Sequence, residues 1–408
     1  MLKRSVISIL IILAIAGLSL GVITYSRGYR INTLQKSLSS TGILSASSYP
    51  DKASIWIDGK LISATNSSIN LSPGWYNVRI SREGYQSWEK KIRIQGEIVS
   101  QLDSLLIPTN PSLRAITITG IMNPVLSPTG NKVAFIVPGE EATKSATLIS
   151  KTGIWVIDLR DGLLGGKSEP KAIFHPSTRQ NWTNAKLVWS PDEKYVLLIF
   201  KSSVQKKEIT TAAFQLLSDS ENVTAIDEKY SLPTLLAQWE SIKTEKEQII
   251  LRTLPTLISD SLLNTSSNWK MSPDETKIIY LATSSANLSQ IITPPLIGSN
   301  PTNETRKIEK GKYYIYDQKE DKNFYITDNK SFPNPESLIW YSDSKHIIMI
   351  EKGTISIIDY DSTNKRVVYS GPFTDNIVYS WPPGGKLVTM MNLNNQKALS
   401  NLYEIDLR

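Results

Sequence analysis

Two pairs of neighbouring carboxylates occupy matching positions in two similar phrases of the sequence. Residues 189–200 read WSPDEKYVLLIF and residues 271–282 read MSPDETKIIYLA, so Asp192 and Glu193 correspond to Asp274 and Glu275. Paired carboxylates bind metal ions or move protons in active sites. The alternative is architectural, because proline fixes the backbone angle of a tight turn and an aspartate or serine side chain caps the amides of that turn.

Few other side chains are suited to acid–base or nucleophilic chemistry. The chain has no cysteine, which excludes disulfides, thiolate metal sites and a cysteine nucleophile. Of the two histidines, His175 precedes Pro176 in an expected loop and His346 lies in an expected buried strand, and neither has a nucleophile or a metal-ligand spacing beside it. We therefore predict no catalytic, cofactor-binding or metal-binding residues, no cofactor and no enzymatic activity. A hydrolase that uses acidic residues on the face of the fold is the alternative.

Two glycine-containing segments match enzyme signatures without the structural context that those signatures require. Gly17 to Gly21 (GLSLG) fits the nucleophile elbow of hydrolases, but its serine lies within a long apolar segment. Residues 162–168 (GLLGGKS) look like a phosphate-binding loop, but Asp161 replaces the required glycine and Pro170 interrupts the helix that should follow. We interpret the second segment as a turn.

The N-terminal residues are uncharged over the thickness of a bilayer. Ser5 to Tyr25 carry no charge, and about 20 apolar residues in a helix span roughly 30 Å of hydrocarbon. We predict a membrane anchor within residues 1–30 and a linker at 31–42. A signal peptide cleaved after Ala16 is the alternative, and it would leave an apolar mature end. Gly17 and Gly21 also fit the pattern through which two membrane helices pair, so a weak helix–helix dimer stands beside a lone anchor.

Residues 43–107 predict a small antiparallel β-sandwich. Residues 53–57 alternate between apolar and polar with the period of a strand, and Asp58-Gly59 follows as a tight turn. Residues 76–81 and 91–94 alternate in the same way. We expect the aromatic residues here to pack in the core or on the sheet faces rather than to form a ligand platform: Trp56, Trp75, Tyr85 and Trp88.

This segment resembles the PEGA domain family in four motifs of matching order and spacing. They are the S-x-P-x-x-A pattern at 48–53, IDGK at 57–60, LSPGWYNV at 71–78 and EGY at 83–85. Lys52 departs from the glycine that is usual in the naming motif. The resemblance implies a non-catalytic adhesion or spacer module outside the membrane, and hence an anchor whose C-terminal side faces outward.

The phrase that contains the carboxylate pairs occurs in five versions in the second part of the chain. Its copies begin at residues 126, 189, 271, 340 and 381, and each joins a tight turn to a short apolar strand through a lysine: Lys132, Lys194, Lys277, Lys345 and Lys386. The turn looks one residue longer in the copies at 126 and 271. A second phrase, an alternating strand closed by an aspartate, follows at 154–158, 314–317, 355–359 and 403–406, and faintly at 214–219. Since the copies lie in different repeats, the two carboxylate pairs should lie far apart, which favours turn capping.

These phrases resemble the TolB-like and WD-repeat-like β-propeller repeats, whose signature is W-S-P-D-G-x-x-I-x-F. The glycine of that signature is replaced by Glu193 and Glu275. Residues 112–408 are therefore expected to form a propeller of about six blades, within a range of five to seven. Residues 242–253 (IKTEKEQIILRT) would be a degenerate blade, and residues 114–119 would supply the strand that closes the ring.

Together these patterns predict an all-β chain with an N-terminal transmembrane helix, a small sandwich and a propeller. Net charge is +7 but the basic residues are scattered, which argues against nucleic-acid binding. We expect a single-pass cell-membrane protein with extracytoplasmic C-terminal domains, in which a PEGA spacer displays a propeller that binds an envelope protein or a cell-wall or surface glycan. The long loops at 138–152, 201–212 and 283–311 are the expected binding elements.

Overall fold

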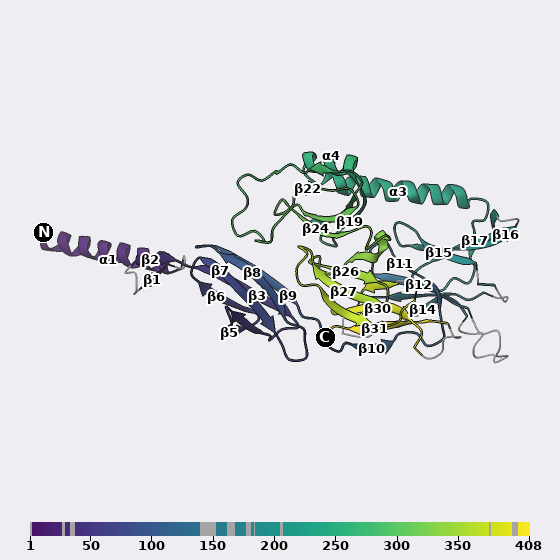
Figure 1. Ribbon diagram of the computed structural model, residues 1–408, viewed down its shortest axis with the longest axis horizontal. Coiled ribbons are helices and arrows are strands. Elements are labelled where there is room, and N and C mark those ends of the chain that lie inside the picture. Colours follow the sequence, from purple (N-terminus) through teal and green to yellow (C-terminus); the bar gives the residue numbers. More distant parts are fainter. Residues whose placement is uncertain are drawn as a thin grey trace. The chain divides into compact units, whose positions relative to one another are not determined.

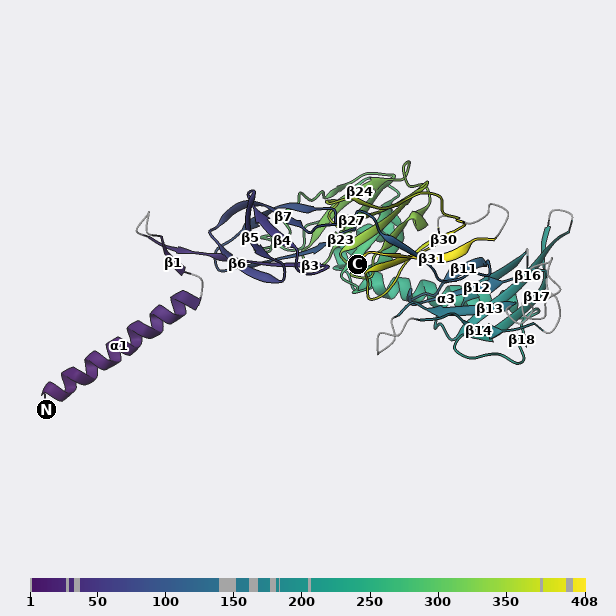
Figure 2. The same ribbon diagram turned by 90° about the horizontal axis from the view of Figure 1, so that it is seen from below.

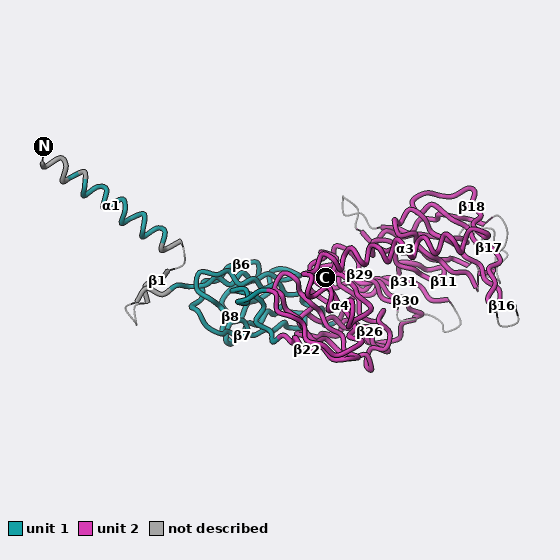
Figure 3. Tube along the Cα trace, turned by 90° about the horizontal axis from the view of Figure 1, so that it is seen from above, with its two compact units in different colours: residues 1–109, 292–303 teal, residues 110–291, 304–408 magenta. Residues whose placement is uncertain are grey.

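The structure is a computed structural model of the chain. It describes residues 2–26, 29–32, 37–138, 152–160, 168–176, 181–182, 184–204, 207–374, 377–393 and 399–408. The chain divides into two compact units (Figure 3). Unit 1 comprises Met1–Thr109 and Ile292–Asn303, and unit 2 comprises Asn110–Ile291 and Glu304–Arg408.

Unit 1 begins with helix α1 (Leu2–Ser26), which confirms the predicted N-terminal helix. Its described apolar side chains are exposed, for example Leu13 and Leu18. Among the helix residues that the structure describes, no segment reaches the length and hydropathy that a bilayer crossing requires. The predicted transmembrane span at Ser5 to Tyr25 is therefore not supported by the structure. Strands β1 (Tyr29–Asn32) and β2 (Ser37–Ser40) form a hairpin in the stretch that the sequence predicts as a linker.

The rest of unit 1 contains a sandwich of two sheets (Figure 1). One sheet has the order β6-β3-β9 and the other the order β5-β4-β7-β8. The strands are β3 (Gly42–Tyr49), β4 (Ser54–Ile57), β5 (Lys60–Ala64), β6 (Ser67–Leu71), β7 (Gly74–Ser81), β8 (Trp88–Ile94) and β9 (Val99–Leu105). The prediction of a wholly antiparallel sandwich is wrong in one pairing, because β3 and β9 run parallel. Both sheets turn apolar side chains inward, including Ile55, Ile80, Trp88 and Leu44.

In its described residues, unit 2 contains five four-stranded sheets, each open and antiparallel, a two-stranded pair, and two α-helices. The number of four-stranded sheets lies within the predicted range and below its centre of six. The first sheet is β11 (Met122–Leu126), β12 (Lys132–Val137), β13 (Gly153–Asp158) and β14 (Lys171–Phe174); the second is β15 (Ala185–Trp189), β16 (Tyr195–Val204), β17 (Lys207–Leu217) and β18 (Ile226–Asp227). The third is β19 (Ser266–Met271), β20 (Lys277–Ala282), β23 (Lys312–Asp317) and β24 (Lys322–Asp328); the fourth is β25 (Leu338–Trp340), β26 (His346–Glu351), β27 (Thr354–Asp359) and β28 (Arg366–Ser370). A 3-10 turn, η1 (Pro335–Ser337), precedes β25.

The remaining sheet joins the two ends of unit 2, as the sequence predicts. This closing sheet has the order β10-β31-β30-β29, with β10 (Ser112–Ala115), β29 (Val378–Ser380), β30 (Lys386–Met391) and β31 (Asn401–Asp406). Leu113 lies opposite Ile405 in the antiparallel pair of β10 and β31. The two ends of unit 2 are thus hydrogen-bonded in one sheet.

Apolar clusters follow the order of the sheets around unit 2. The closing and first sheets share a cluster that includes Phe135 and Val388, and the first and second sheets share one that includes Ile154 and Trp189. The third and fourth sheets share a cluster that includes Ile315 and Trp340. The fourth sheet meets the closing sheet through Tyr341, whose hydroxyl accepts a hydrogen bond from the amide of Gly385.

Helices α3 (Leu232–Arg252) and α4 (Thr256–Thr265) connect the second sheet to the third. Figure 1 shows α3 running from the side of β16 and β17 to α4 and β19. Trp239 packs on Leu197 and Ile199 of the second sheet, and Leu251 packs with Tyr280 of the third sheet. The prediction of a degenerate blade at 242–253 is therefore wrong: this segment is helical, and its long run of good helix formers (KTEKEQ) is consistent with that.

The five repeated turns share one geometry. In each copy a backbone amide donates a hydrogen bond to the backbone carbonyl five residues later. The five pairs are Ser127 to Lys132, Ser190 to Tyr195, Ser272 to Lys277, Tyr341 to His346 and Trp381 to Lys386. The turns therefore do not differ in length, contrary to the prediction, and the lysines 194 and 345 lie in the turn instead of in the strand. At the matching position each turn has a residue with positive φ: Gly130 (φ 76), Glu193 (φ 60), Glu275 (φ 58), Ser344 (φ 63) and Gly384 (φ 129). In the last turn Gly385 (φ 85) also has positive φ.

This geometry makes Glu275→Gly a stabilising or neutral change. A left-handed backbone costs a residue with a Cβ atom roughly 1 kcal/mol, whereas glycine adopts this backbone without that cost. Glycine also raises the entropy of the unfolded chain, which cancels part of the gain in stability. The side chain of Glu275 is exposed. We expect the melting temperature of unit 2 to rise by about 1–3 °C in Glu275→Gly and to fall in Glu275→Val, measured by scanning calorimetry. A loss of stability in Glu275→Gly as large as that in Glu275→Val would contradict this account.

Candidate functional site

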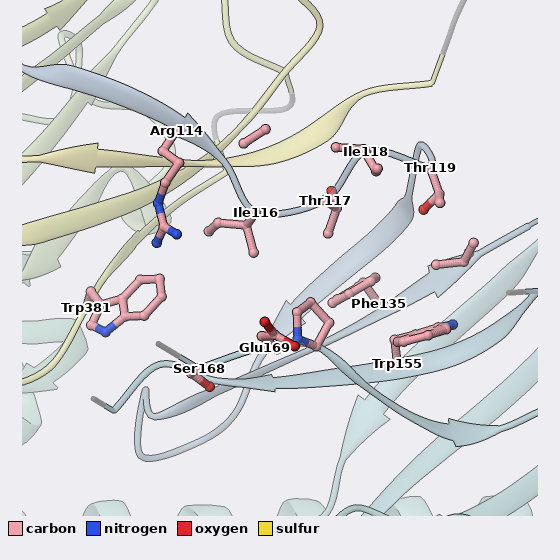
Figure 4. A pocket seen from close by; sticks show the side chains of 13 residues that line it. Arg114, Ile116, Thr117, Ile118, Thr119, Phe135, Trp155, Ser168, Glu169 and Trp381 are labelled. Carbon is pink, nitrogen blue, oxygen red and sulfur yellow. The ribbon is translucent and has the colours of Figure 1, made fainter. Parts of the chain in front are cut away.

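A cavity of about 330 Å³ lies between the closing sheet and the first sheet of unit 2 (Figure 4). Figure 4 shows Arg114 and Trp381 on one side, Phe135 and Trp155 on the other, and Glu169 between them. The lining residues come from β10 and the segment after it, from β12 and β13, from the stretch before β14 and from the end of β29: Arg114, Ala115, Ile116, Thr117, Ile118, Thr119, Phe135, Val137, Trp155, Ser168, Glu169, Pro170 and Trp381.

The cavity has a rigid floor and an exposed rim. Phe135 and Trp381 are 1% and 2% exposed, so their rings are fixed by the core cluster that the two sheets share. Ile118, by contrast, is 81% exposed. The hydroxyl of Thr117 donates to Asn401 and accepts from the amide of Leu402, which ties the segment after β10 to β31. An apolar group could therefore displace water from the cavity without a change in the backbone.

The charged groups beside the cavity are two cations and two carboxylates. Glu404 on β31 is buried and forms an ion pair with Arg114. Its other oxygen lies 3.6 Å from Nζ of Lys386, and that nitrogen lies 4.8 Å from the centre of the Trp381 ring. One buried carboxylate is thus shared by two cations, and the Arg114 side chain remains 42% exposed. A ligand with an apolar body and a polar end fits this arrangement best, because Arg114 and Glu169 both line the cavity.

The aspartates of the two carboxylate pairs cap their own turns, as predicted, whereas Glu193 accepts a hydrogen bond from the amide of Thr129. The hydroxyl of Ser190 donates to Oδ1 of Asp192 at 2.7 Å, and the amide of Lys194 donates to the same oxygen at 3.2 Å. Ser272 and the amide of Thr276 contact Asp274 in the same way, at 2.7 and 3.2 Å. The pKa values of both aspartates are lowered: for Asp192 the hydrogen bond from Ser190 is the main cause, and for Asp274 the hydrogen bonds outweigh the opposing effect of burial. Within the described residues, no group of three or more His, Asp or Glu side chains is placed to hold a metal ion.

His346 is an internal ion-pair residue. It is 4% exposed, its Nδ1 lies 2.6 Å from Asp343 and its Nε2 lies 3.2 Å from Asp359. Burial alone would lower the pKa of His346, but the charges of and hydrogen bonds to Asp343 and Asp359 outweigh burial and raise this pKa to about 10. The imidazole is therefore a cation at neutral pH, which is unsuited to a general base. His175 contacts the carbonyl of Thr152 through Nδ1 at 2.8 Å.

The same position of the repeat carries a cation in other sheets. Lys132 faces Asp158 across β12 and β13, and Lys277 faces Asp317 across β20 and β23, with 3.6 Å between the charged atoms of the second pair. His346 replaces the lysine in the fourth sheet, and in the second sheet Tyr195 faces Leu217 instead. The recurring lysine and the strand-ending aspartate that the sequence shows are thus opposite partners in one hairpin.

Parts of the three long loops that the sequence predicts are strands or lie outside the described residues. Residues 139–151 and most of 162–168, the phosphate-loop look-alike, lie outside the described residues. Most of the predicted loop at 201–212 is strand, because β16 and β17 continue as a hairpin through it. In the third loop, β21 (Ala286–Asn287) pairs with β22 (Lys307–Ile308), and Ile292–Asn303 belongs to unit 1, where the amide of Gly298 donates to Oε1 of Gln95 at 2.7 Å.

The repeats do not reveal the cavity, because the residues that line it come from two copies and from segments between the copies. Phe135 and Trp381 belong to the copies at 126 and 381, whereas Arg114 and Ile118 lie in the closing segment and Glu169 follows the glycine-rich turn. The sequence alone carries no signal that brings these segments together.

A protein-family model matches the sandwich of unit 1. Residues 41–110 match the family model described as PEGA domain, which confirms the resemblance of residues 43–107. The comparison with curated proteins gives no match.

Solved structures similar to the chain include two TolB proteins and a propeller domain. The TolB from Agrobacterium tumefaciens is 14% identical, with 68% of this chain and 76% of that chain covered and a TM-score of 0.20. The TolB from Acinetobacter baumannii is 13% identical, with 81% and 59% covered and a TM-score of 0.22. The β-propeller domain of the Trilobed protease from Pyrococcus furiosus is 13% identical, with 91% and 97% covered and a TM-score of 0.22. The description of unit 2 as a propeller depends on its own sheets and not on these similarities.

The buried imidazolium predicts how stability depends on pH. Because the pKa of His346 is raised on folding, its contribution is complete below pH 6.5 and is lost as pH rises toward 10. We expect the melting temperature of the wild type to fall between pH 7 and pH 10 by several degrees more than that of His346→Gln, measured by calorimetry. The variant is the control for the lysines and tyrosines that also titrate near pH 10, because both proteins contain them. Parallel pH profiles for the two proteins would contradict a charged His346.

Proposed function

We propose that this chain is a non-catalytic, membrane-anchored protein of the cell envelope that binds a partner through unit 2. The observation that carries the proposal is the cavity at the closing sheet, which combines buried aromatic rings with an exposed apolar rim and with the charged side chains of Arg114 and Glu169. An envelope protein or a cell-wall or surface glycan are the partner classes that suit such a site. The match of residues 41–110 to the PEGA domain supports a display role for unit 1.

The proposed anchor is the uncharged run from Ser5 to Tyr25. The described part of α1 does not by itself meet the requirement for a bilayer span, so this part of the proposal depends on the sequence. The described side chains of α1 include many large apolar groups that are about half exposed or more, such as Ile12 and Val22. In water such a surface is costly, and burial in lipid would remove that cost. The C-terminal domains would then face away from the cytoplasm.

The alternative, an envelope hydrolase that uses acidic residues, finds less support in the cavity. A glycosidase uses two carboxyl groups on opposite sides of the scissile bond. Among the described residues that line the cavity, Glu169 is the one carboxylate. Glu404 is buried and already shared by two cations. Binding therefore suits the lining better than hydrolysis.

The role of the cavity can be tested by changing its rim. Detergent-solubilised full-length chain would be immobilised and exposed to separate protein and glycan fractions of the cell envelope. We expect Ile118→Asp to abolish the retention of whichever fraction binds, because it places a charge where an apolar group should lie. Val223→Asp is the matched control, since Val223 is 94% exposed and does not line the cavity. Equal retention by all three proteins would exclude the cavity as the binding site, and glycan turnover that is lost in Glu169→Gln would establish the hydrolase instead.

The anchor is tested separately by fractionation. We expect the wild type to remain in the membrane pellet after extraction at alkaline pH, and the double variant Leu10→Asp with Leu13→Asp to move to the supernatant, because two central carboxylates are costly in hydrocarbon. Protection of the C-terminal domains from protease in spheroplasts would contradict the proposed orientation. A wild type that is extracted as readily as the variant would contradict the anchor.

A further inference from the structure

The outer face of the sheet β5-β4-β7-β8 in unit 1 carries aromatic and basic side chains on adjacent strands. Strand alternation places Ile55, Val78, Ile80 and Ile92 in the core. The residues between them therefore face outward. Cross-strand register then sets Trp56 beside Arg79, Asn77 beside Lys91 and Trp75 beside Arg93.

Two indole rings on this face each lie under a cation. The guanidinium carbon of Arg79 lies 4.8 Å from the centre of the Trp56 ring, and Nζ of Lys91 lies 5.5 Å from the centre of the Trp75 ring. The indole N–H of Trp56 donates to Oγ of Ser81 at 3.1 Å, which fixes the orientation of that ring. Trp75 is 52% exposed. Trp88, in contrast, is buried in the core, so the four aromatic residues of this segment divide between core and surface.

A shallow hollow of about 470 Å³ adjoins the Trp56 and Arg79 pair. It is lined by Trp56, Gly59, Asn77, Val78, Arg79, Glu89, Lys90 and Lys91. Three of these residues are basic and one is acidic, so the hollow has an excess of positive charge. The backbone of Asn77 is held in place, because its backbone amide donates a hydrogen bond to Oδ1 of Asp58 at 2.9 Å.

We infer that this aromatic and basic face, defined by Trp56, Trp75, Arg79 and Lys91, binds a carboxylate-bearing polysaccharide. The guanidinium and ammonium groups that lie over the two rings pair with carboxylates of the polymer, and the exposed part of the Trp75 side chain packs against the apolar C–H groups of a sugar. Two such pairs on neighbouring strands match a polymer in which acidic sugars repeat. Unit 1 is then a binding module in its own right, which goes beyond the display role proposed above.

A bilayer surface is the competing occupant, and the geometry favours it less. Residues that enter the interface of a bilayer present apolar edges that project from the protein. On this face the indole of Trp56 is tied back to Ser81 by its N–H, and both rings have cations above them. The hollow lies between strands instead of forming a protruding ridge.

The test measures the binding of full-length protein in detergent to polygalacturonate, to neutral dextran and to vesicles of phosphatidylglycerol mixed with phosphatidylcholine. We expect binding to polygalacturonate that weakens with salt, with little binding to dextran. Trp75→Ala and Lys91→Gln should each weaken that binding about tenfold or more. Both side chains are exposed, so these variants should keep the melting temperature of the wild type.

The chain offers a matched control in unit 2. Nζ of Lys229 lies 5.7 Å from the centre of the Tyr230 ring, and Tyr230 is 91% exposed, so it forms a similar pair outside this face. The double variant Lys229→Gln with Tyr230→Ala should bind polygalacturonate as the wild type does, and so should Ile118→Asp, which changes the cavity of unit 2. Equal affinity for dextran and polygalacturonate, unchanged binding by Trp75→Ala and Lys91→Gln, or a preference for vesicles that these variants abolish would each overturn the inference.

Discussion

Both faces of each sheet in unit 2 are apolar, and each face must be covered by a neighbour. Sheet packs on sheet at most positions around the unit, through the clusters that contain Phe135, Trp189 and Trp340. Between the second and third sheets, α3 and α4 take this role. Residues 240–246 of α3 are exposed, whereas Trp239 and Leu251 are buried against the two sheets. A helix of 21 residues is about 30 Å long, so α3 contacts one sheet near each of its ends and spans the distance between them in solvent.

Closure of unit 2 also places the candidate site. The cavity is bounded by β10, which enters the closing sheet beside β31, and by the first sheet that follows β10 in the chain. Arg114 lies opposite Glu404 because of this pairing, and the two are 290 residues apart in sequence. A site of this kind exists only when the ends of the unit have joined. Its binding capacity should therefore be lost together with closure, and not with the folding of any single sheet.

The repeated phrase gave a reliable prediction of the strands and turns, because its residues satisfy their hydrogen bonds locally. Asp192 and Asp274 cap their own turns, and Glu193 and Glu275 adopt the left-handed backbone that glycine supplies elsewhere. The helices between the second and third sheets were not predicted, since the β-branched residues within 242–253 are also typical of a strand. The first residue of the copy differs where the helices precede it. Trp189 and Trp340 each donate an indole hydrogen bond to the preceding sheet, at Val125 and Lys270, whereas the copy that follows the helices has Met271 in that place. The cavity and the face of unit 1 were beyond prediction from periodicity, because each combines side chains from strands whose pairing the sequence does not state.

The ion pairs of the repeat explain why residues that suggest catalysis are not available for it. Lys277 with Asp317, and His346 with Asp343 and Asp359, are buried, and each charge there is stable only because its partner is present. A group that accepted or released a proton during a reaction would leave that partner uncompensated in the core. Such residues are committed to the fold. The cations that lie at the surface next to an aromatic ring are of a different kind, such as Lys91 over Trp75 in unit 1. A ligand can meet such a cation without breaking a buried ion pair.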